Sequence, residues 1–482
     1  MYLTTLVHLI AGIAATADAP TQYDVAVRDI SGKLRSGRLT ALDAQQLSVK
    51  ANGGNTFALP MSQLLRIDRG TPLRTGKPSP AFVYLANGDR LAVTATKLDG
   101  DDLHVAWSGI PGIPALKLPL LSVRAIVLQR PAGRTAFRQL ESQLLAHRQQ
   151  HDLLVLRNGD QVTGRLKSLD ADHVVMSGTA GKIPRSNVRA VAFDPRYVET
   201  PKSTERILLR LADGTRVSAK SAVLKSGGKL RVQLQTGGEI GIPWSAVVSL
   251  QRVGGNVLPL SSLAPATFEH TPYLDGQWPL QTDRNVLGGP LVLRGREYSL
   301  GLGMHSRSRA VYDLPPNAAH FLATIGIDDA ARGKGAAVFV VQLDGKTVFT
   351  SPLLRGKDAP VQVGPIPLAG SKRLTLAVEF GRSGDILDYA DWCDAVLVGK
   401  SKVEESKVGK SKVGRSEGRR SEGRNDEGRN LYDRRAAFEQ SVPSTQYPVL
   451  STQYSVLGTM GTRSQPTLRP STLRPLTFDF RL

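Results

Sequence analysis

Residues 152–193 read DLLVLRNGDQVTGRLKSLDADHVVMSGTAGKIPRSNVRAVAF, and this stretch decides the fold of the first half of the chain. It consists of an apolar run, the turn pair Asn158-Gly159, an alternating run, a second turn, a short run, a proline and a final apolar run. Asn-Gly favours a type I′ hairpin, because both central residues of that turn need a positive φ. The pattern predicts a small unit of four or five antiparallel strands.

The same pattern recurs three more times in the first half of the chain. Residues 207–250 and 81–128 repeat it closely, and residues 25–67 follow it more loosely. Each unit has a proline before its last apolar run, where a strand start tolerates the missing N–H. These prolines are Pro60, Pro119, Pro184 and Pro243. In pattern the units resemble small Sm-like or SH3-like barrels, so we expect two β repeats in residues 20–133 and two more in residues 152–262.

A helical pattern separates the second and third repeats. Between residues 134 and 151, Phe137, Leu140, Leu144 and Leu145 recur at the spacing of one helix face. We therefore expect a helical spacer over 134–151.

Longer strands characterise residues 265–399. The stretch AVFVVQLDGKTVFTS (337–351) contains two alternating runs around Asp344-Gly345, and RLTLAVEF (373–380) alternates in the same way. Several strands at about 10-residue spacing without a helical pattern predict an antiparallel β-sandwich. The expected fold class is thus mainly β, with tandem barrel-like repeats followed by a sandwich.

Three stretches of this region carry a family resemblance. They read LVLRGREYSLGLGMHSRSRAVYDLP (291–315), HFLATIGIDDAARGKGAAVFVVQLDGKTVFTS (320–351) and DYADWCDAVLV (388–398). Their order and spacing resemble the carbohydrate-binding module associated with glycosyl hydrolase family 98, the NPCBM family, over about residues 272–398. The resemblance implies a jelly-roll-like sandwich, attachment to extracellular enzymes or envelope proteins, and binding of galactose-type glycans.

A sugar site needs an aromatic face for the C–H side of the ring and fixed polar groups for the hydroxyls. Residues of these types in the sandwich are Trp278, Tyr298, His305, Asp391 and Trp392. Other interpretations stay open, because Trp392 lies in an alternating strand and also fits a core position. His305 equally fits a buried histidine bonded to the backbone. These five residues are the candidate ligand-binding residues.

Aspartates in the same region could hold a structural Ca²⁺, which prefers six to eight oxygen ligands. The candidate ligands are Asp328, Asp329, Asp388 and Asp394. Aspartates that form turns or end strands explain the same residues equally well.

The chain of 482 residues is basic, with Lys+Arg 62 against Asp+Glu 42 and a formal charge of +20. Such an excess favours phosphate contacts. The repeats, however, do not interleave aromatic with basic residues as single-strand binders do, so we expect solvated strand faces and no nucleic-acid partner. The single cysteine, Cys393, excludes an intramolecular disulfide and cysteine-rich metal sites.

The two ends of the chain differ from the rest. Residues 1–19 contain an uncharged apolar stretch followed by small residues, which is typical of a signal peptide. Residues 400–482 are low-complexity repeats, for which we expect disorder. No other stretch is long and apolar enough for a transmembrane span. We therefore expect export to the periplasm, the cell envelope or the exterior.

The sequence favours a non-catalytic glycan-binding protein. No H-E-x-x-H motif occurs, and no alternating strand and helix pattern is present to hold a pair of catalytic carboxylates. Two alternatives remain: a glycoside hydrolase or its accessory subunit, and a protein-interaction scaffold built on the repeats. Envelope proteins or glycosidases are the expected protein partners.

Overall fold

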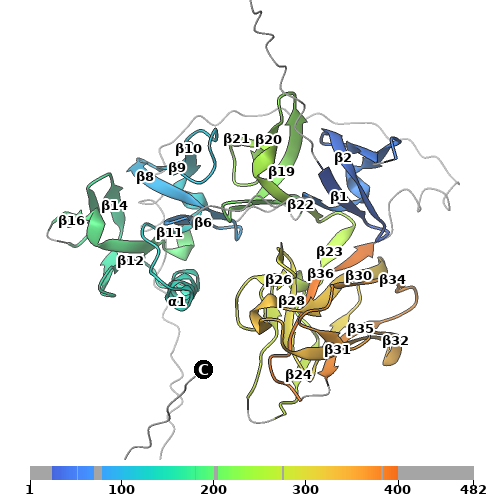
Figure 1. The fold of residues 1–482 in the computed structure, drawn as a ribbon. Coiled ribbons are helices and arrows are strands. Elements are labelled where there is room, and N and C mark those ends of the chain that lie inside the picture. The colour runs from blue at the N-terminus through green and yellow to red at the C-terminus, as the bar shows by residue number, and fades with distance from the viewer. Residues whose placement is uncertain are drawn as a thin grey trace, which may run out of the picture. The chain divides into compact units, whose positions relative to one another are not determined.

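The computed structural model describes residues 24–399, apart from 52, 70–78, 180, 200–204, 274–275 and 382–383. The expected signal peptide (1–19) and tail (400–482) lie outside the described residues. The described chain is mainly β, as the sequence predicts, and contains one α-helix and several 3₁₀ turns (Figure 1). No helix in this part of the chain is both long enough and apolar enough to cross a membrane.

In the described part of the chain, the four repeats consist of antiparallel strands, five each in repeats 1 and 4 and six each in repeats 2 and 3, where the sequence predicts four or five. Repeat 1 contains β1 (Asp24–Asp29), β2 (Leu34–Leu42), β3 (Gln46–Ala51), β4 (Thr56–Pro60) and β5 (Leu64–Arg69). Repeat 2 contains β6 (Phe82–Leu85), β7 (Arg90–Leu91), β8 (Val93–Asp99), β9 (Asp102–Trp107), β10 (Leu116–Pro119) and β11 (Val123–Val127). Repeat 3 contains β12 (Asp152–Leu156), β13 (Gln161–Gly164), β14 (Leu166–Leu169), β15 (His173–Met176), β16 (Ile183–Pro184) and β17 (Val188–Ala192). Repeat 4 contains β18 (Arg206–Leu211), β19 (Arg216–Lys225), β20 (Lys229–Leu234), β21 (Glu239–Pro243) and β22 (Val247–Val253).

The proline of each repeat ends the next-to-last strand, and a 3₁₀ turn follows it directly. These turns are η1 (Met61–Gln63), η2 (Leu120–Ser122), η3 (Arg185–Asn187) and η5 (Trp244–Ala246). Each turn leads directly into the last strand of its repeat. Two further 3₁₀ turns in this part and at the start of the sandwich are η4 (Pro195–Tyr197) and η6 (Leu260–Ser262).

The repeats do not lie in sequence order within their shared sheet. The last strands pair two by two, β5 with β22 and β11 with β17, and β7 joins β19 through Arg90 and Arg216. The order along the sheet is therefore repeat 3, repeat 2, repeat 4, repeat 1. The first and the last repeat are direct neighbours.

The helix α1 (Arg134–Ala146) is five residues shorter than the expected 134–151. His147 follows in an extended conformation, and this ends the helix. Phe137, Leu140 and Leu144 pack on apolar side chains of β6, β11, β12 and β17. The helix therefore covers the sheet that repeats 2 and 3 share.

The second half of the described chain is a sandwich of two six-stranded sheets, which confirms the prediction (Figure 1). One sheet contains β23 (Val257–Pro259), β25 (Gln281–Thr282), β28 (Gly301–His305), β30 (Ala318–Ile327), β34 (Val361–Pro367) and β36 (Tyr389–Gly399). The other contains β24 (Thr267–His270), β29 (Ser308–Asp313), β31 (Ala336–Leu343), β32 (Lys346–Thr350), β33 (Leu354–Arg355) and β35 (Arg373–Phe380). The remaining elements are a hairpin of β26 (Leu291–Leu293) and β27 (Arg296–Tyr298), and the 3₁₀ turn η7 (Asp329–Ala331).

The repeats and the sandwich share buried contacts. Strand β23 directly follows repeat 4 and pairs with β36, so residues 257–259 extend a sandwich sheet although the sequence places them with repeat 4. Leu65 of repeat 1 belongs to one buried cluster with Val257, Leu322 and Val396 of the sandwich. Burial of such apolar area is the main term that stabilises a protein contact.

A buried arginine crosses the same contact. The Arg66 side chain in β5 is 2% exposed and pairs with Asp394 of β36, with Nη1 3.2 Å from Oδ2. Its Nε lies 2.8 Å from Oδ1 of Asp68, and its guanidinium stacks on the Tyr298 ring at 4.8 Å. Asp394 also accepts a hydrogen bond of 2.9 Å from Gln251. The charged groups of Arg66, Asp68 and Asp394 are all paired, which a buried charge requires, whereas Oε1 of Gln251 has no hydrogen-bond partner among the described residues.

Candidate functional site

An aromatic cluster lies at one end of the sandwich. Trp278, in the loop between β24 and β25, stacks parallel on the imidazole of His305, with ring centres 4.7 Å apart and planes 5° apart. Tyr389 lies 6.1 Å from Trp278 and 5.9 Å from His305, and His270 meets His305 edge-on at 5.9 Å. We call these four residues the Trp278 cluster. His270 comes from one sheet and His305 and Tyr389 from the other, so the cluster lies where the two sheets end together.

Hydrogen bonds fix both histidines. Nδ1 of His305 donates to the carbonyl of Ser306 at 2.8 Å. His270 accepts from the backbone N–H of Trp278 at 3.4 Å through Nδ1, and its Nε2 lies 3.3 Å from the same Ser306 carbonyl. Burial lowers the pKa of His305, so its imidazole is held neutral beneath Trp278. The two histidines thereby anchor the loop that carries Trp278.

Polar and exposed apolar groups surround the cluster. Asp388 accepts hydrogen bonds of 2.7 Å from the Ser306 hydroxyl and from the backbone N–H of Ala336. Two large apolar side chains at this end are exposed, Tyr273 at 62% and Ile386 at 70%. Tyr273, in the same loop as Trp278, packs edge-on against Phe380 at 5.7 Å. The end of the sandwich therefore combines aromatic faces with acceptors and donors, which is the chemistry of a sugar-binding surface.

The structure separates the five candidate ligand-binding residues into two groups. Trp278 and His305 lie together in the Trp278 cluster, whereas Asp391, Trp392 and Tyr298 are buried elsewhere. Trp392 is fully buried and packs against Phe321 and Phe339 in the core between the sheets. The interpretation as a core residue, left open by the sequence, describes its position.

Asp391 and Tyr298 lie on the other side of β36. The hairpin of β26 and β27 covers this side, because Leu291, Leu293 and Tyr298 form a buried cluster with Cys393. Asp391 is inaccessible, and burial together with the charge of Asp328 raises its pKa well above the ordinary value. Both faces of β36 are thus covered, which its alternating sequence did not reveal.

The sequence did not identify two members of the cluster. His270 ends a short strand in a region without a motif. Tyr389 follows Asp388 and precedes Asp391, and of these three residues only the aspartates were candidates. The register between β28 and β36, which pairs His305 with Tyr389, is what brings the latter into the site. Only the strand pairing could have identified Tyr389.

Comparison with known proteins assigns this region to a family. Residues 257–398 match the NPCBM/NEW2 domain. The matched range includes all four residues of the Trp278 cluster, and it begins at β23, which precedes the expected 272.

Two curated relatives match part of the chain. One is a Renibacterium salmoninarum protein provisionally named endo-alpha-N-acetylgalactosaminidase, 39% identical over 108 residues. The other is the alpha-1,3-galactosidase B of Akkermansia muciniphila, 29% identical over 115 residues. The matches cover 22% and 23% of this chain but 7% and 14% of those relatives. The chain thus spans a small part of the relatives' length.

Solved structures give similar matches. The CBM51 module of a Clostridium perfringens GH95 protein, solved with methyl-galactose, is 28% identical, covers 30% of this chain and 99% of its own, and has a TM-score of 0.27. The tandem CBM51 modules of a Streptococcus pneumoniae family 98 glycoside hydrolase are 12% identical, cover 78% and 88%, and have a TM-score of 0.26.

The four candidate calcium ligands of the NPCBM/NEW2 domain do not gather at one place. Asp328 accepts from Asn285, Val292 and Ala330, while Asp329 accepts from the backbone of residues 294 and 295. Asp388 bonds Ser306 and Ala336, and Asp394 bonds Arg66 and Gln251, as described above. Within residues 24–399 as described, no three His, Cys, Asp or Glu side chains are grouped so that they could hold a metal ion. The aspartates instead fix loops and the contact with repeat 1.

Proposed function

We propose that the chain is an exported, non-catalytic protein whose NPCBM/NEW2 domain binds galactose-type glycans through the Trp278 cluster. The observation that carries this proposal is the parallel stack of Trp278 on a neutral His305 inside the region that matches the family. Both curated relatives are named for enzymes that act on galactose-type sugars, which supports this ligand class.

The geometry of the cluster suits the C–H face of a sugar ring. His305 occupies one face of the Trp278 indole, so a sugar would stack on the opposite face. A neutral support matters, because a charged imidazole would hold water at the edge of an apolar platform. The ring of the half-buried Tyr389 is centred 6.1 Å from that of Trp278, and its hydroxyl would supply a polar partner for a sugar hydroxyl beside the platform.

Substitution of the platform tests the proposal. The full chain is titrated with galactose, N-acetylgalactosamine and lactose by calorimetry, beside a glycan array. We expect Trp278→Ala to weaken binding about tenfold, since burying the face of a large aromatic side chain against a ligand contributes on the order of 1–2 kcal/mol. Tyr389→Phe, which removes one hydroxyl, should weaken binding about 3- to 10-fold.

Trp107→Ala is the matched control, because it makes the same change in β9 of repeat 2. It should leave the affinity unchanged. An absence of binding across the array, or equal losses in the Trp278 and Trp107 variants, would contradict the proposal.

The remaining parts of the proposal concern location and partners. Export rests on residues 1–19, and the envelope or exterior is where a glycan-binding module meets its ligands. Cell fractionation of the full chain and of a chain lacking residues 2–19 tests this, and retention of both in the cytoplasm would contradict it. Glycosidases and envelope proteins are the partners that the non-catalytic role implies.

A further inference from the structure

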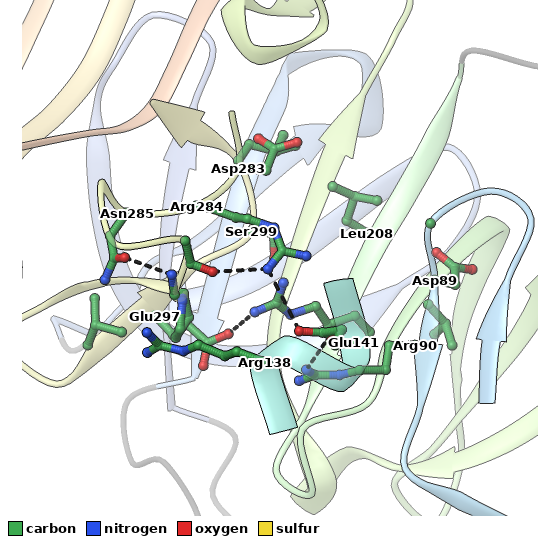
Figure 2. A pocket seen from close by; sticks show the side chains of 18 of the residues that line it. Asp89, Arg90, Arg138, Glu141, Leu208, Asp283, Arg284, Asn285, Glu297 and Ser299 are labelled. Atoms are coloured by element: carbon green, nitrogen blue, oxygen red, sulfur yellow. Dashed lines mark hydrogen bonds and ion pairs between the residues drawn. The ribbon is translucent and has the colours of Figure 1, made fainter. Parts of the chain in front are cut away.

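A large polar cavity lies between the repeats and the sandwich. It has a volume of about 680 Å³, and its wall comes from repeat 2, α1, repeat 4 and the loops of the sandwich around residues 283–300. Among the described residues, six arginines and six acidic residues line it. Figure 2 shows several of them, including Arg90, Glu141, Arg284 and Glu297, around the space. We call this space the arginine cavity.

Ion pairs between different parts of the chain hold the wall in place. Glu141 of α1 lies 3.7 Å from Arg90 of repeat 2 and 3.7 Å from Arg284 of the sandwich (Figure 2). Glu297 of the hairpin pairs with Arg210 at 2.8 Å and with Arg216, both from repeat 4. Glu141 and Glu297 are thus already paired with arginines of the chain.

The loop that carries Arg284 is also held by its close packing on β28. A Cβ on Gly303 would lie 2.4 Å from the backbone oxygen of Arg284 and 2.5 Å from the backbone of Asn285. Because glycine alone allows this approach, the loop packs directly on β28. The wall is therefore preorganised, which lowers the cost of binding a ligand.

Three guanidinium groups of the wall are incompletely hydrogen-bonded. The Nε atoms of Arg90, Arg206 and Arg216 are buried, and none of them has a hydrogen-bond acceptor among the described residues. All three arginines line the arginine cavity. A buried donor without an acceptor is costly, so the wall carries guanidinium groups that its own residues do not fully satisfy.

An adjoining compartment adds positive charge. This second space of about 1190 Å³ shares Arg90, Arg130, Phe137 and Glu297 with the arginine cavity. Among the described residues, seven arginines and three acidic residues line it. The guanidinium of Arg130 lies over the ring of Phe137 at 4.5 Å, so an aromatic ring and not a carboxylate holds it in place. The excess of guanidinium groups favours an anion.

From these observations we infer that the arginine cavity and its adjoining compartment form a second binding site, for an acidic sugar that carries carboxylate or sulfate groups. Guanidinium groups bind the oxyanions, and the carboxylates and amides of the wall accept from the hydroxyls. This site is separate from the Trp278 cluster and does not depend on the function proposed for it.

The same lining disfavours nucleic acid. A phosphodiester chain carries a charge at every nucleotide and would meet the carboxylates of the wall. Among the described residues, the two rings that line these spaces, Phe82 and Phe137, are 4% and 7% exposed and each lies against an arginine, so bases would find no open ring to stack on. An acidic sugar presents fewer charges and many hydroxyls, which matches the mixed wall.

Titration with defined oligosaccharides tests the second site. The full chain is titrated by calorimetry, at physiological ionic strength, with a chondroitin 4-sulfate hexasaccharide, with the unsulfated chondroitin hexasaccharide and with neutral maltohexaose. Binding of both chondroitin forms assigns the carboxylate as the recognised group, and binding of the sulfated form alone assigns the sulfate. Both results support the site.

Two variants remove donors from the site, Arg206→Gln and Arg130→Gln. Each should weaken chondroitin binding at least about tenfold, as expected for loss of a charge-assisted hydrogen bond. Arg373→Gln is the matched control, because it removes the same charge from an exposed pair with Asp313 on the sandwich. Thermal unfolding confirms that each variant is folded. If Arg206→Gln is too unstable to test, the affinity of Arg130→Gln decides the result.

Three results would overturn the proposal. The first is an absence of binding to either chondroitin hexasaccharide. The second is an equal loss in Arg373→Gln, which would show attraction to the overall charge. The third is tighter binding of a single-stranded oligonucleotide of equal charge with the same losses in the two variants, which would assign the site to nucleic acid.

Discussion

The repeats meet the sandwich at two places of opposite chemistry. Around Leu65 and Leu322 the contact is apolar and closed, and its buried charges include Arg66, which pairs with Asp68 and Asp394, and Arg28, which donates to Thr324 at 3.0 Å. Around Arg90 and Arg284 the contact is polar and encloses the arginine cavity. The closed contact holds the repeats against the sandwich. The second contact therefore does not need to be filled by side chains, and its cavity can hold a ligand.

Breaking the closed contact should have the largest effect. Arg66→Ala leaves Asp394 buried without its ion-pair partner, so we expect the free energy of unfolding to fall by about 3–5 kcal/mol. Urea denaturation followed by tryptophan fluorescence measures this loss. The matched control is Arg373→Ala, whose pair with Asp313 is exposed and should contribute less than about 1 kcal/mol. Equal losses in the two variants would show that the closed contact contributes little.

A smaller effect on stability is expected at Asp391. This buried residue lies beside Asp328, which lines the arginine cavity. The unfolded carboxyl has an ordinary pKa near 3.9, and burial together with the charge of Asp328 raises the folded pKa well above that. Between these two pKa values the folded chain keeps a proton that the unfolded chain has lost. Stability therefore falls as pH rises, by about 1.4 kcal/mol per pH unit, until the folded pKa is reached.

Asp391→Asn tests this sign. The amide has nearly the same shape and no charge, so at pH 7 the variant should be more stable than the parent. Its stability should also change less between pH 4 and pH 7. Thermal unfolding across that range measures both effects. A variant that is less stable than the parent at pH 7 would mean that Asp391 is ionised and paired in the folded chain.

The smallest effect is expected at the rim of the polar contact. Arg284 is partly exposed and lies 3.7 Å from Glu141, so Arg284→Gln should cost less than about 1 kcal/mol. Differential scanning calorimetry of this variant beside Arg66→Ala gives the contrast directly. A loss as large as that of Arg66→Ala would show that the polar contact also holds the two parts together.

Local patterns predicted most of the fold. Asn158-Gly159 and the recurrent prolines gave the repeat units, and alternation in residues 337–351 gave the sandwich. These features depend on neighbouring residues, so a sequence reveals them. The pairing of β5 with β22 depends on residues far apart in the chain, and no local pattern encodes it.

The candidate site was predicted in part for the same reason. Trp278 and His305 carry the right chemistry and lie together, but Trp392 was indistinguishable from them because a strand sequence does not say what covers each face. The hairpin of β26 and β27 covers one face of β36, and the second sheet covers the other. The arginine cavity was hidden altogether, since its wall comes from five separate stretches of the described sequence.

The spatial order of the repeats has a consequence for synthesis. Roughly 180 residues separate β5 from β22, so a ribosome adding about 5–20 residues per second needs on the order of 10–40 s to supply the partner strand. During that interval the edge of the first repeat has unpaired backbone groups, which is the usual template for aggregation. A chaperone or an early translocation step that shields this edge would determine the yield of folded protein more than the stability of the finished chain does.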